Sequence, residues 1–250
     1  MGFCEDYHKV VYGMRHKLTL VRKNDDDAIQ RIAHPGTGKI ELTKVACVMP
    51  RFHPSDVKKF SLYNTIESKV VLDAAFRMRQ CSSAEIPPQT QTFDWRLGVP
   101  TAPEKPRHLL IAFQHERSGD QTKNPSLFDH LSATEVNDTK YPARGVIADF
   151  PKHKHVEYYK MFSEFARDYY GLDPLTVSNF VDIVTYKEEF PIFYIDVSKQ
   201  SERIRQSAVD IKVRIRFAEN VGAHVVAYAL VISDRKLKFQ SDRKKMNVIY

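Results

Sequence analysis

The sequence has few cysteines, and no two of them are close together. Cys4, Cys47 and Cys81 are the three in 250 residues, an odd number with no CxxC spacing. This pattern argues against a disulfide framework and against a zinc site. The simplest interpretation is three reduced thiols, which are typical of an intracellular compartment.

Long hydrophobic stretches are also missing. No apolar run approaches the roughly 20 residues that a membrane-spanning helix needs, so no membrane partner is expected. Residues 1–7 do not combine a basic region with an apolar stretch, so there is no secretory signal. We therefore expect a protein that is not secreted.

Catalytic and cofactor motifs are absent as well. The sequence contains no GxSxG and no HExxH, and the segment Gly36–Lys39 lacks the spacing of a phosphate-binding loop. His153 and His155 stand two residues apart at the expected start of a helix, so they do not share a face that could hold a metal. We expect no catalytic residue, no metal ligand and no cofactor, and we predict that the protein is not an enzyme.

The composition is typical of a globular protein with an excess of positive charge. Apolar residues make up 42% and charged residues 28% of the chain, which argues against global disorder. The net charge is +7, and excess Lys and Arg attract polyanions, of which nucleic acid is the usual one. Arg243, Lys244 and Lys245 concentrate this charge near the C-terminus and are candidate nucleic-acid-binding residues. The alternative is a basic surface without a dedicated ligand.

Two segments near the C-terminus carry the clearest pattern. In residues 209–217 apolar and charged residues alternate, which predicts a strand with one dry and one wet face. The wet face holds Lys212, Arg214 and Arg216, about 7 Å apart, a spacing that suits successive phosphates. Alternatively, these charges are only solvated or pair with acids on the neighbouring strand. Residues 225–232 are apolar on both sides, which predicts a strand buried on both faces and hence stacked antiparallel sheets.

Shorter patterns predict the other elements. Ser55 is expected to cap a short helix that extends to Ile66. Residues 152–170 carry an aromatic stripe typical of a helix that lies on a sheet. A polar loop at 116–128 has the length of loops that make surface contacts. Further strands are expected at residues 16–22, 40–49 with a β-bulge, 69–79, 90–97, 107–114, 191–197 and, after a break at 233–235, 236–239.

Eight short segments share their order and spacing with a known family. They are Gly2–Tyr7, Val48–Phe52, Glu104–Arg107, Ile111–Gln114, Phe128–His130, Asp168–Gly171, Ile195–Glu202 and Ala227–Arg235. In these segments the sequence resembles the double jelly-roll-like proteins of insect and other invertebrate genomes. Those proteins are related to the major capsid proteins of Polinton-type and similar large double-stranded DNA elements.

The resemblance implies a mainly β fold, an antiparallel jelly-roll sandwich with short rim helices and one longer helix near 154–170. The match corresponds to the second of the family's two jelly rolls. We therefore expect one jelly-roll domain at residues 1–240 and a basic tail at 241–250.

The resemblance also implies a function. We expect a viral capsid-like structural protein, or a copy retained by a host, that acts by self-assembly in a virion or inside a cell. The implied partners are further copies of the chain, in a trimer or a pseudo-hexameric ring, and a separate first jelly roll.

Two other hypotheses remain. One is a nucleic-acid-binding module that uses the basic face of residues 209–217 and the C-terminal tail for weak, non-specific contact with DNA. The other is a cupin- or lectin-type jelly roll, which would need clustered histidines, and no GxxxxHxH segment is present.

Overall fold

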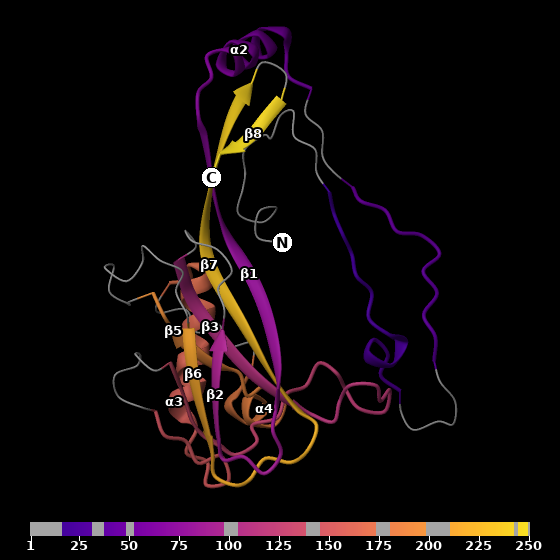
Figure 1. Cartoon of the computed structure of the whole chain (residues 1–250), viewed down its shortest axis with the longest axis vertical. Coiled ribbons are helices and arrows are strands. Elements are labelled where there is room, and N and C mark those ends of the chain that lie inside the picture. The colour runs from indigo at the N-terminus through magenta and orange to yellow at the C-terminus, as the bar shows by residue number, and fades with distance from the viewer. Residues whose placement is uncertain are drawn as a thin grey trace.

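The computed structural model contains eight strands and a few helices in its described part, and Figure 1 shows their arrangement. The strands are β1 (Leu72–Ile86), β2 (Thr92–Leu97), β3 (Lys105–His115), β4 (Ala133–Asp138), β5 (Phe193–Asp196), β6 (Ile211–Phe217), β7 (Val225–Asp242) and β8 (Lys245–Ile249). The helices are α2 (Asp56–Glu67), α3 (Val156–Tyr170), α4 (Ile183–Glu188) and the 3-10 turn η1 (Asp25–Asp27). The structure describes residues 17–31, 38–48, 53–97, 105–138, 146–173, 181–198, 211–242 and 245–249.

The strands pair in the order of a jelly roll. Sheet A has the order β1-β7-β3-β5, with β8 paired to the end of β7, and sheet B has the order β2-β6-β4. β1 pairs with β7, β2 with β6 and β3 with β5, all antiparallel, so the chain forms a nested hairpin whose strands alternate between the sheets. The expected mainly β sandwich of two antiparallel sheets with few helices is thus confirmed.

The core fills the space between the two sheets. β6 alternates buried apolar and exposed basic residues along its whole length, as the sequence predicted. From the opposite sheet, β3 points Leu109, Ile111 and Phe113 inward. The ring centroid of Phe113 lies 5.7 Å from those of Phe193 and Phe217, so it joins both sheets. Replacing such a buried ring with alanine costs roughly 3–5 kcal/mol.

α3 lies on the outer face of sheet A, as its aromatic stripe predicted. The ring centroid of Phe165 is 5.4 Å from that of His108 and 5.0 Å from that of Tyr194. The helix ends at Gly171, whose φ of 64° lies in the left-handed region that favours glycine. One part of the outer face of sheet A is therefore covered by the chain itself.

The first turn of α3 is also tied to sheet B. Tyr158 is fully buried, and its hydroxyl accepts a hydrogen bond from the backbone N–H of Val136 on β4 and donates one to the carbonyl of Val146, each at 2.9 Å. Burial raises the pKa of Tyr158, so the hydroxyl keeps its proton and its role as a donor. This single side chain satisfies two backbone groups that would otherwise be unpaired.

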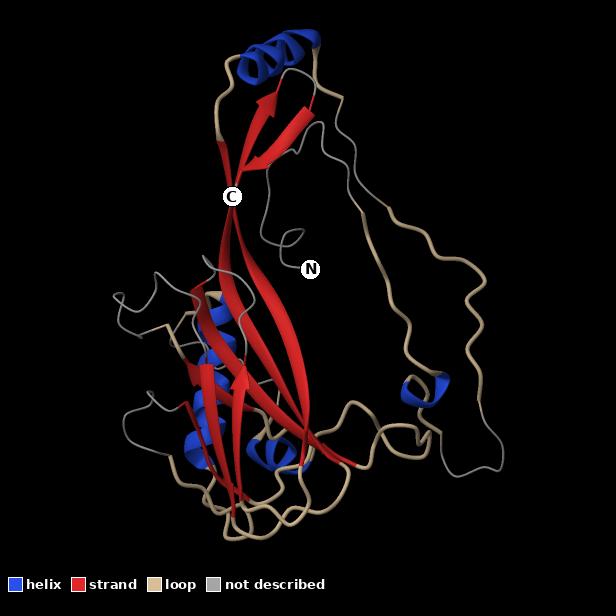
Figure 2. Ribbon diagram, viewed as in Figure 1, coloured by secondary structure: helices blue, strands red, loops and turns tan. Residues whose placement is uncertain are grey.

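β1 and β7 continue beyond the sandwich as a two-stranded ribbon, which carries β8 and, at its tip, α2 (Figures 1 and 2). Residues 17–31 and 38–48, called the limb here, run apart from the sandwich as extended chain with η1 as a short turn (Figure 2). Most exposed large apolar side chains of the described residues lie in the limb, in α2 or at the start of β1.

The strands predicted at 16–22 and 40–49, and the β-bulge in the second, are wrong for the described residues 17–22 and 40–48, which form no ladder. Their alternating apolar residues favour a strand, but a strand needs a partner, and none of the described strands pairs with them. Residues 16 and 49 lie outside the described part.

The predicted break at 233–235 is also wrong. Ser233, Asp234 and Arg235 continue the ladder opposite β1 residues, so β7 is one long strand. Polar side chains end a strand only when no neighbour pairs with its backbone, and here β1 pairs with β7 from Val225 to Phe239.

Several element boundaries differ from the predictions. β4 and α4 were not predicted, and β1 extends to Ile86. α2 is present, but the Ser55 side chain makes no capping hydrogen bond. Of the predicted basic tail, residues 241 and 242 end β7 and residues 245–249 form β8. The division into a domain at 1–240 and a tail at 241–250 stays a prediction.

Candidate functional site

The predicted nucleic-acid site on β6 is a face of mixed charge. Lys212, Arg214 and Arg216 are exposed on the outer face of sheet B, as predicted. Arg214 donates hydrogen bonds to the Asp94 carboxylate from Nε at 2.7 Å and from Nη2 at 3.0 Å, and Arg216 Nη1 lies 3.1 Å from Glu135 Oε2. Both acids stand directly opposite in the ladder, on β2 and β4. Two of the three basic residues thus pair with neighbouring acids.

This pairing perturbs the acid and the base in opposite directions. The hydrogen bond from Arg214 holds the pKa of the Asp94 carboxyl below its usual value, and the charges of Arg216 and Lys212 add to the effect. The same bond raises the pKa of Arg214. Exposed ion pairs contribute little to stability because water screens them. A polyanion on this face would have to compete with both carboxylates for the guanidinium groups.

Of the other predicted residues, only Lys245 lies within the described part of the chain. Arg243 and Lys244 lie outside the described residues. Lys245 begins β8 on the ribbon, at the opposite end of the molecule from the sandwich that contains β6 (Figure 1). Nucleic-acid binding by Lys212, Arg214, Arg216, Arg243, Lys244 and Lys245 therefore stays a prediction.

The outer face of sheet A has an apolar part, in contrast to that of sheet B. Its outward side chains come from successive cross-strand rows of β1, β7 and β3, such as the row Cys81, Leu230 and Leu110. α3 covers the neighbouring part of this face around Tyr194. Beside it lies a groove of about 360 Å³, called the outer groove here, whose lining includes Cys81, Leu110, Tyr228 and Leu230 from sheet A and also Lys23 of the limb and Gln114.

The sequence contained a signal for this groove. Residues 225–232 are apolar on both sides, and burial on both faces was predicted. The structure buries the inward residues of this segment and leaves the outward Tyr228 and Leu230 half-exposed. The sequence did not predict Cys81 as part of an apolar surface. Its outward neighbours on β1, Arg79 and Ser83, are polar, so the pattern of β1 does not predict a strand that is apolar on both faces.

The polar loop at 116–128 contacts the limb of the same chain. Gln121 is buried, and its side-chain oxygen accepts a hydrogen bond from Gly38 N at 2.8 Å while its Nε2 donates to Asp26 Oδ1 at 2.8 Å. Asp27 Oδ1 accepts a hydrogen bond from Gly119 N at 2.8 Å. The loop thus anchors the η1 end of the limb.

Two histidines stack on either side of a buried phenylalanine. The Phe150 ring lies 4.7 Å from the His130 ring and 5.2 Å from the His155 ring, nearly parallel to both. His155 is buried, and its Nδ1 has no hydrogen-bond partner. Burial lowers the pKa of both imidazoles, and the positive charge of Lys187 lowers them further, while Asp129 partly opposes this at His130. The stack therefore favours neutral histidines.

In the described part of the chain, no group of three or more His, Cys, Asp or Glu side chains is placed to hold a metal ion. Nor does any helix there have the length and apolar character needed to cross a bilayer. The described surfaces include a charged face on sheet B, a groove on sheet A with a largely apolar lining, and a limb with several exposed apolar side chains.

The fold is a jelly-roll sandwich with exposed apolar side chains, most of which lie outside the two sheets of the sandwich. Residues 1–237 match the model of the double jelly roll-like domain family. The chain belongs to this family. Among curated proteins, none matches the sequence.

Two solved structures from viruses are similar over part of their length. A chain of "PBCV-1 virus capsid, quasi-atomic model" matches 76% of this chain and 54% of its own length, with 9% identity and a TM-score of 0.38. A chain of the 3.5 Å cryo-EM structure of the Sputnik virophage matches 72% of this chain and 39% of its own length, with 11% identity and a TM-score of 0.35. This chain thus spans about half or less of both. Scores of this size support no argument about it.

Proposed function

We propose that this protein is a capsid-like structural subunit that acts by self-association rather than by catalysis. One observation carries the proposal: the chain leaves many large apolar side chains exposed, most of them outside the sandwich. Val48 of the limb is 91% exposed and Val57 of α2 is 79% exposed, while the outer groove opens on sheet A. Exposed apolar side chains that gather in one part of a protein mark contact sites with other proteins.

Membership of the double jelly roll-like family supports this proposal. The resemblance described above relates that family to major capsid proteins, whose jelly rolls assemble side by side. The sandwich of two paired sheets and the exposed apolar side chains suit a structural protein. The proposal includes a location in a virion or inside a cell, and homo-oligomers of trimeric or pseudo-hexameric form.

Light scattering on the size-exclusion peak of the purified chain tests the proposal, together with negative-stain images of the same fraction. A discrete oligomer, ring or shell is the expected result. A clean monomer across the concentration range that can be reached would overturn self-association as the function.

A further inference from the structure

Two tight turns of the chain meet at the buried Phe150 ring. One turn begins at His130 and leads into β4, and the other begins before Phe150 and ends at His155, the residue before α3. We infer that these turns, called the latch here (residues 130–132 and 149–155), open when His130 and His155 take up protons, while the two sheets stay paired. The latch lies within one chain, so the inference does not depend on the proposed self-association.

The His130 ring is held in its neutral form by a backbone group. Its Nδ1 accepts a hydrogen bond from the N–H of Ser132 at 2.9 Å, so Nδ1 carries a lone pair and the proton of the neutral ring sits on Nε2. A charged imidazole has a proton on both nitrogens, so this bond is replaced by two donors that face each other. The turn also contains two positive φ angles, 46° at Leu131 and 49° at Ser132, which are uncommon for residues other than glycine. The ring thus helps to hold a strained turn only while it is neutral.

His155 depends on its neutral form for a different reason. The residue is 4% exposed, and among the described residues its buried Nδ1 has no hydrogen-bond partner. The ring donates a hydrogen bond to the backbone of Ile183 in α4, and because Nδ1 is without a partner, the donor is Nε2. A proton added to Nδ1 is therefore buried without an acceptor, which is costly for a charged group. The turn before His155 also has a positive φ, 57° at His153.

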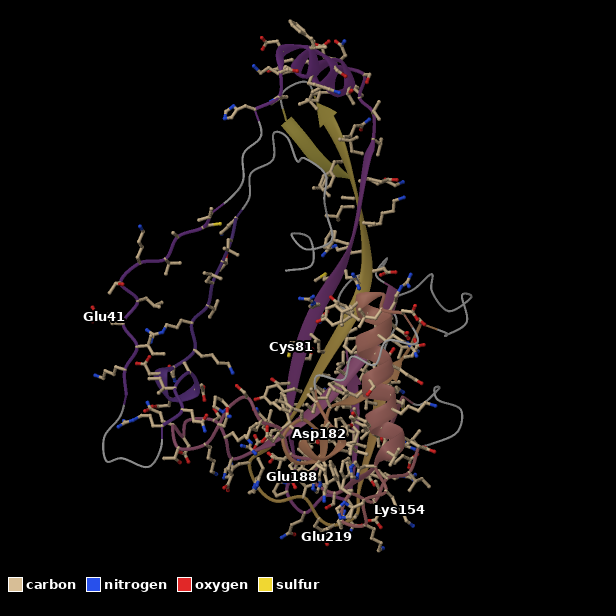
Figure 3. All side chains as sticks on the ribbon, turned by 180° about the vertical axis from the view of Figure 1, so that it is seen from behind. Glu41, Cys81, Lys154, Asp182, Glu188 and Glu219 are labelled. Carbon is tan, nitrogen blue, oxygen red and sulfur yellow. The ribbon has the colours of Figure 1, made fainter. Side chains whose placement is uncertain are left out.

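The strongest charge that acts on both rings is positive. Burial lowers the pKa of each imidazole most, and the charge of Lys187 on α4 lowers it further. Asp129 opposes this at His130, but its carboxylate is already bound by Arg117, whose Nη2 lies 2.6 Å from Oδ1. Figure 3 shows Lys154, Asp182 and Glu188 at this end of the sandwich. The charged or titratable groups that complete the surroundings of the two rings are His153, Lys154, Glu157, Asp182, Tyr186 and Glu188.

The latch lies outside the ladders of both sheets. Asp149 and Lys154 close the second turn through backbone hydrogen bonds of 2.8 and 3.0 Å. The Tyr186 ring of α4 stacks on His155 with centroids 6.5 Å apart, so the latch also holds α4. Loss of the stack therefore frees the turns and α4 by local opening, without unfolding of the sheets.

Hydrogen exchange of the full chain at pH 8 and pH 5, measured at low urea concentrations and corrected for the intrinsic effect of pH, tests the latch. Both rings have lowered pKa values in the closed latch, so the closed form is fully favoured above the free histidine pKa of about 6.5 and is lost as the pH falls below it. The protection of residues 149–155 should be roughly 10-fold or more weaker at pH 5, with little dependence on urea, because the opening exposes little surface. β6 should exchange more slowly at both pH values and depend strongly on urea.

Two results of this experiment overturn the inference. Unchanged protection of residues 149–155 at pH 5 means that the histidines do not control the turns. Exchange of these residues with the rate and the urea dependence of β6 means that they open only when the whole sandwich unfolds. The tautomers give a second measurement that needs no variant: at pH 8, ¹⁵N NMR should show the proton on Nε2 of both rings, and a proton on Nδ1 of either ring contradicts the hydrogen bonds on which the inference rests.

Variants that cannot take up a proton test the two histidines directly. In His130→Asn the side-chain oxygen can accept from the N–H two residues further on at any pH, and in His155→Phe an aromatic ring remains in the stack. The double variant should lose the pH dependence of exchange at residues 149–155. The matched control is His224→Asn, at an exposed residue with a φ of 56°, and it should keep that dependence. A double variant that behaves like the control refutes the role of the two rings.

The number of protons decides the question if His155→Phe does not fold. Opening of the latch in the original chain should take up about two protons, measured as the slope of the opening equilibrium against pH, and opening in His130→Asn about one. An unchanged slope in His130→Asn means that His130 is not part of the device, and the inference fails.

Discussion

Replacing Tyr158 with phenylalanine tests the joint between α3 and sheet B with the loss of one oxygen atom. The substitution keeps the buried ring, whose centroid lies 4.9 Å from that of Phe193. It removes the hydroxyl that pairs with both Val136 N and Val146 O. The packing of the helix is therefore retained while two backbone groups lose their partner.

The magnitude follows from the cost of unpaired groups. A buried donor or acceptor that loses its partner costs about 1–3 kcal/mol. The N–H of Val136 is deeply buried, whereas Val146 is only partly buried and water can replace part of its bond. We expect the free energy of unfolding to fall by about 2–3 kcal/mol in total. For a chain of this size that corresponds to a melting temperature lower by roughly 5–10 °C.

Urea titration followed by circular dichroism measures this change, with Tyr170→Phe as the control. Tyr170 is mostly exposed at the end of the same helix. Its replacement should change the free energy of unfolding by less than about 0.5 kcal/mol. If Tyr158→Phe also stays within that limit, the hydroxyl does not hold α3 to β4 and the reasoning is refuted.

Three further predictions concern other parts of the molecule. The histidines that stack on Phe150 have lowered pKa values in the folded protein. The neutral rings therefore stabilise the fold fully above the unfolded pKa near 6.5, and this stabilisation is lost as the pH falls below that value. The urea midpoint should be lower at pH 5 than at pH 8, and His130→Phe should make this difference smaller. Gly171→Ala should cost about 1 kcal/mol, because alanine is strained at the positive φ found there, whereas Gly222→Ala should cost less in the same melting experiment. Replacing the three basic residues of β6 with serine should leave the salt dependence of DNA binding unchanged, since two of them pair with acids; a slope lower by about three would instead assign them to phosphates.

The sequence predicted a helix or strand correctly where the pattern that indicates the element is also what stabilises it. Alternation in β6 predicted a strand because the same alternation separates core from solvent. The aromatic stripe predicted α3 on a sheet for the same reason. Residues 17–22 carry a similar alternation and do not form a strand, because pairing depends on a neighbour that no local pattern encodes. The continuity of β7 through Ser233 likewise depends on the length of β1.

The candidate surfaces were predictable only in part. The basic face of β6 followed from the sequence, but its pairing with Asp94 depends on the register between β2 and β6. The outer groove requires three strands that are distant in the sequence to place Cys81, Leu110 and Leu230 in one row. Such a row becomes visible only when the topology is known.

The long pairing of β1 with β7 has a consequence for how the protein is made. Leu72 pairs with Phe239 and Ile86 with Val225, so the sheet joins the early and late parts of the chain. Contacts of this kind raise the contact order, and folding slows as contact order rises. During synthesis, β1 emerges from the ribosome long before β7. Until β7 is made, the edge of β1 has no hydrogen-bond partner there and its apolar face is exposed. Chaperone binding to nascent chains of this protein should therefore persist until translation is almost finished.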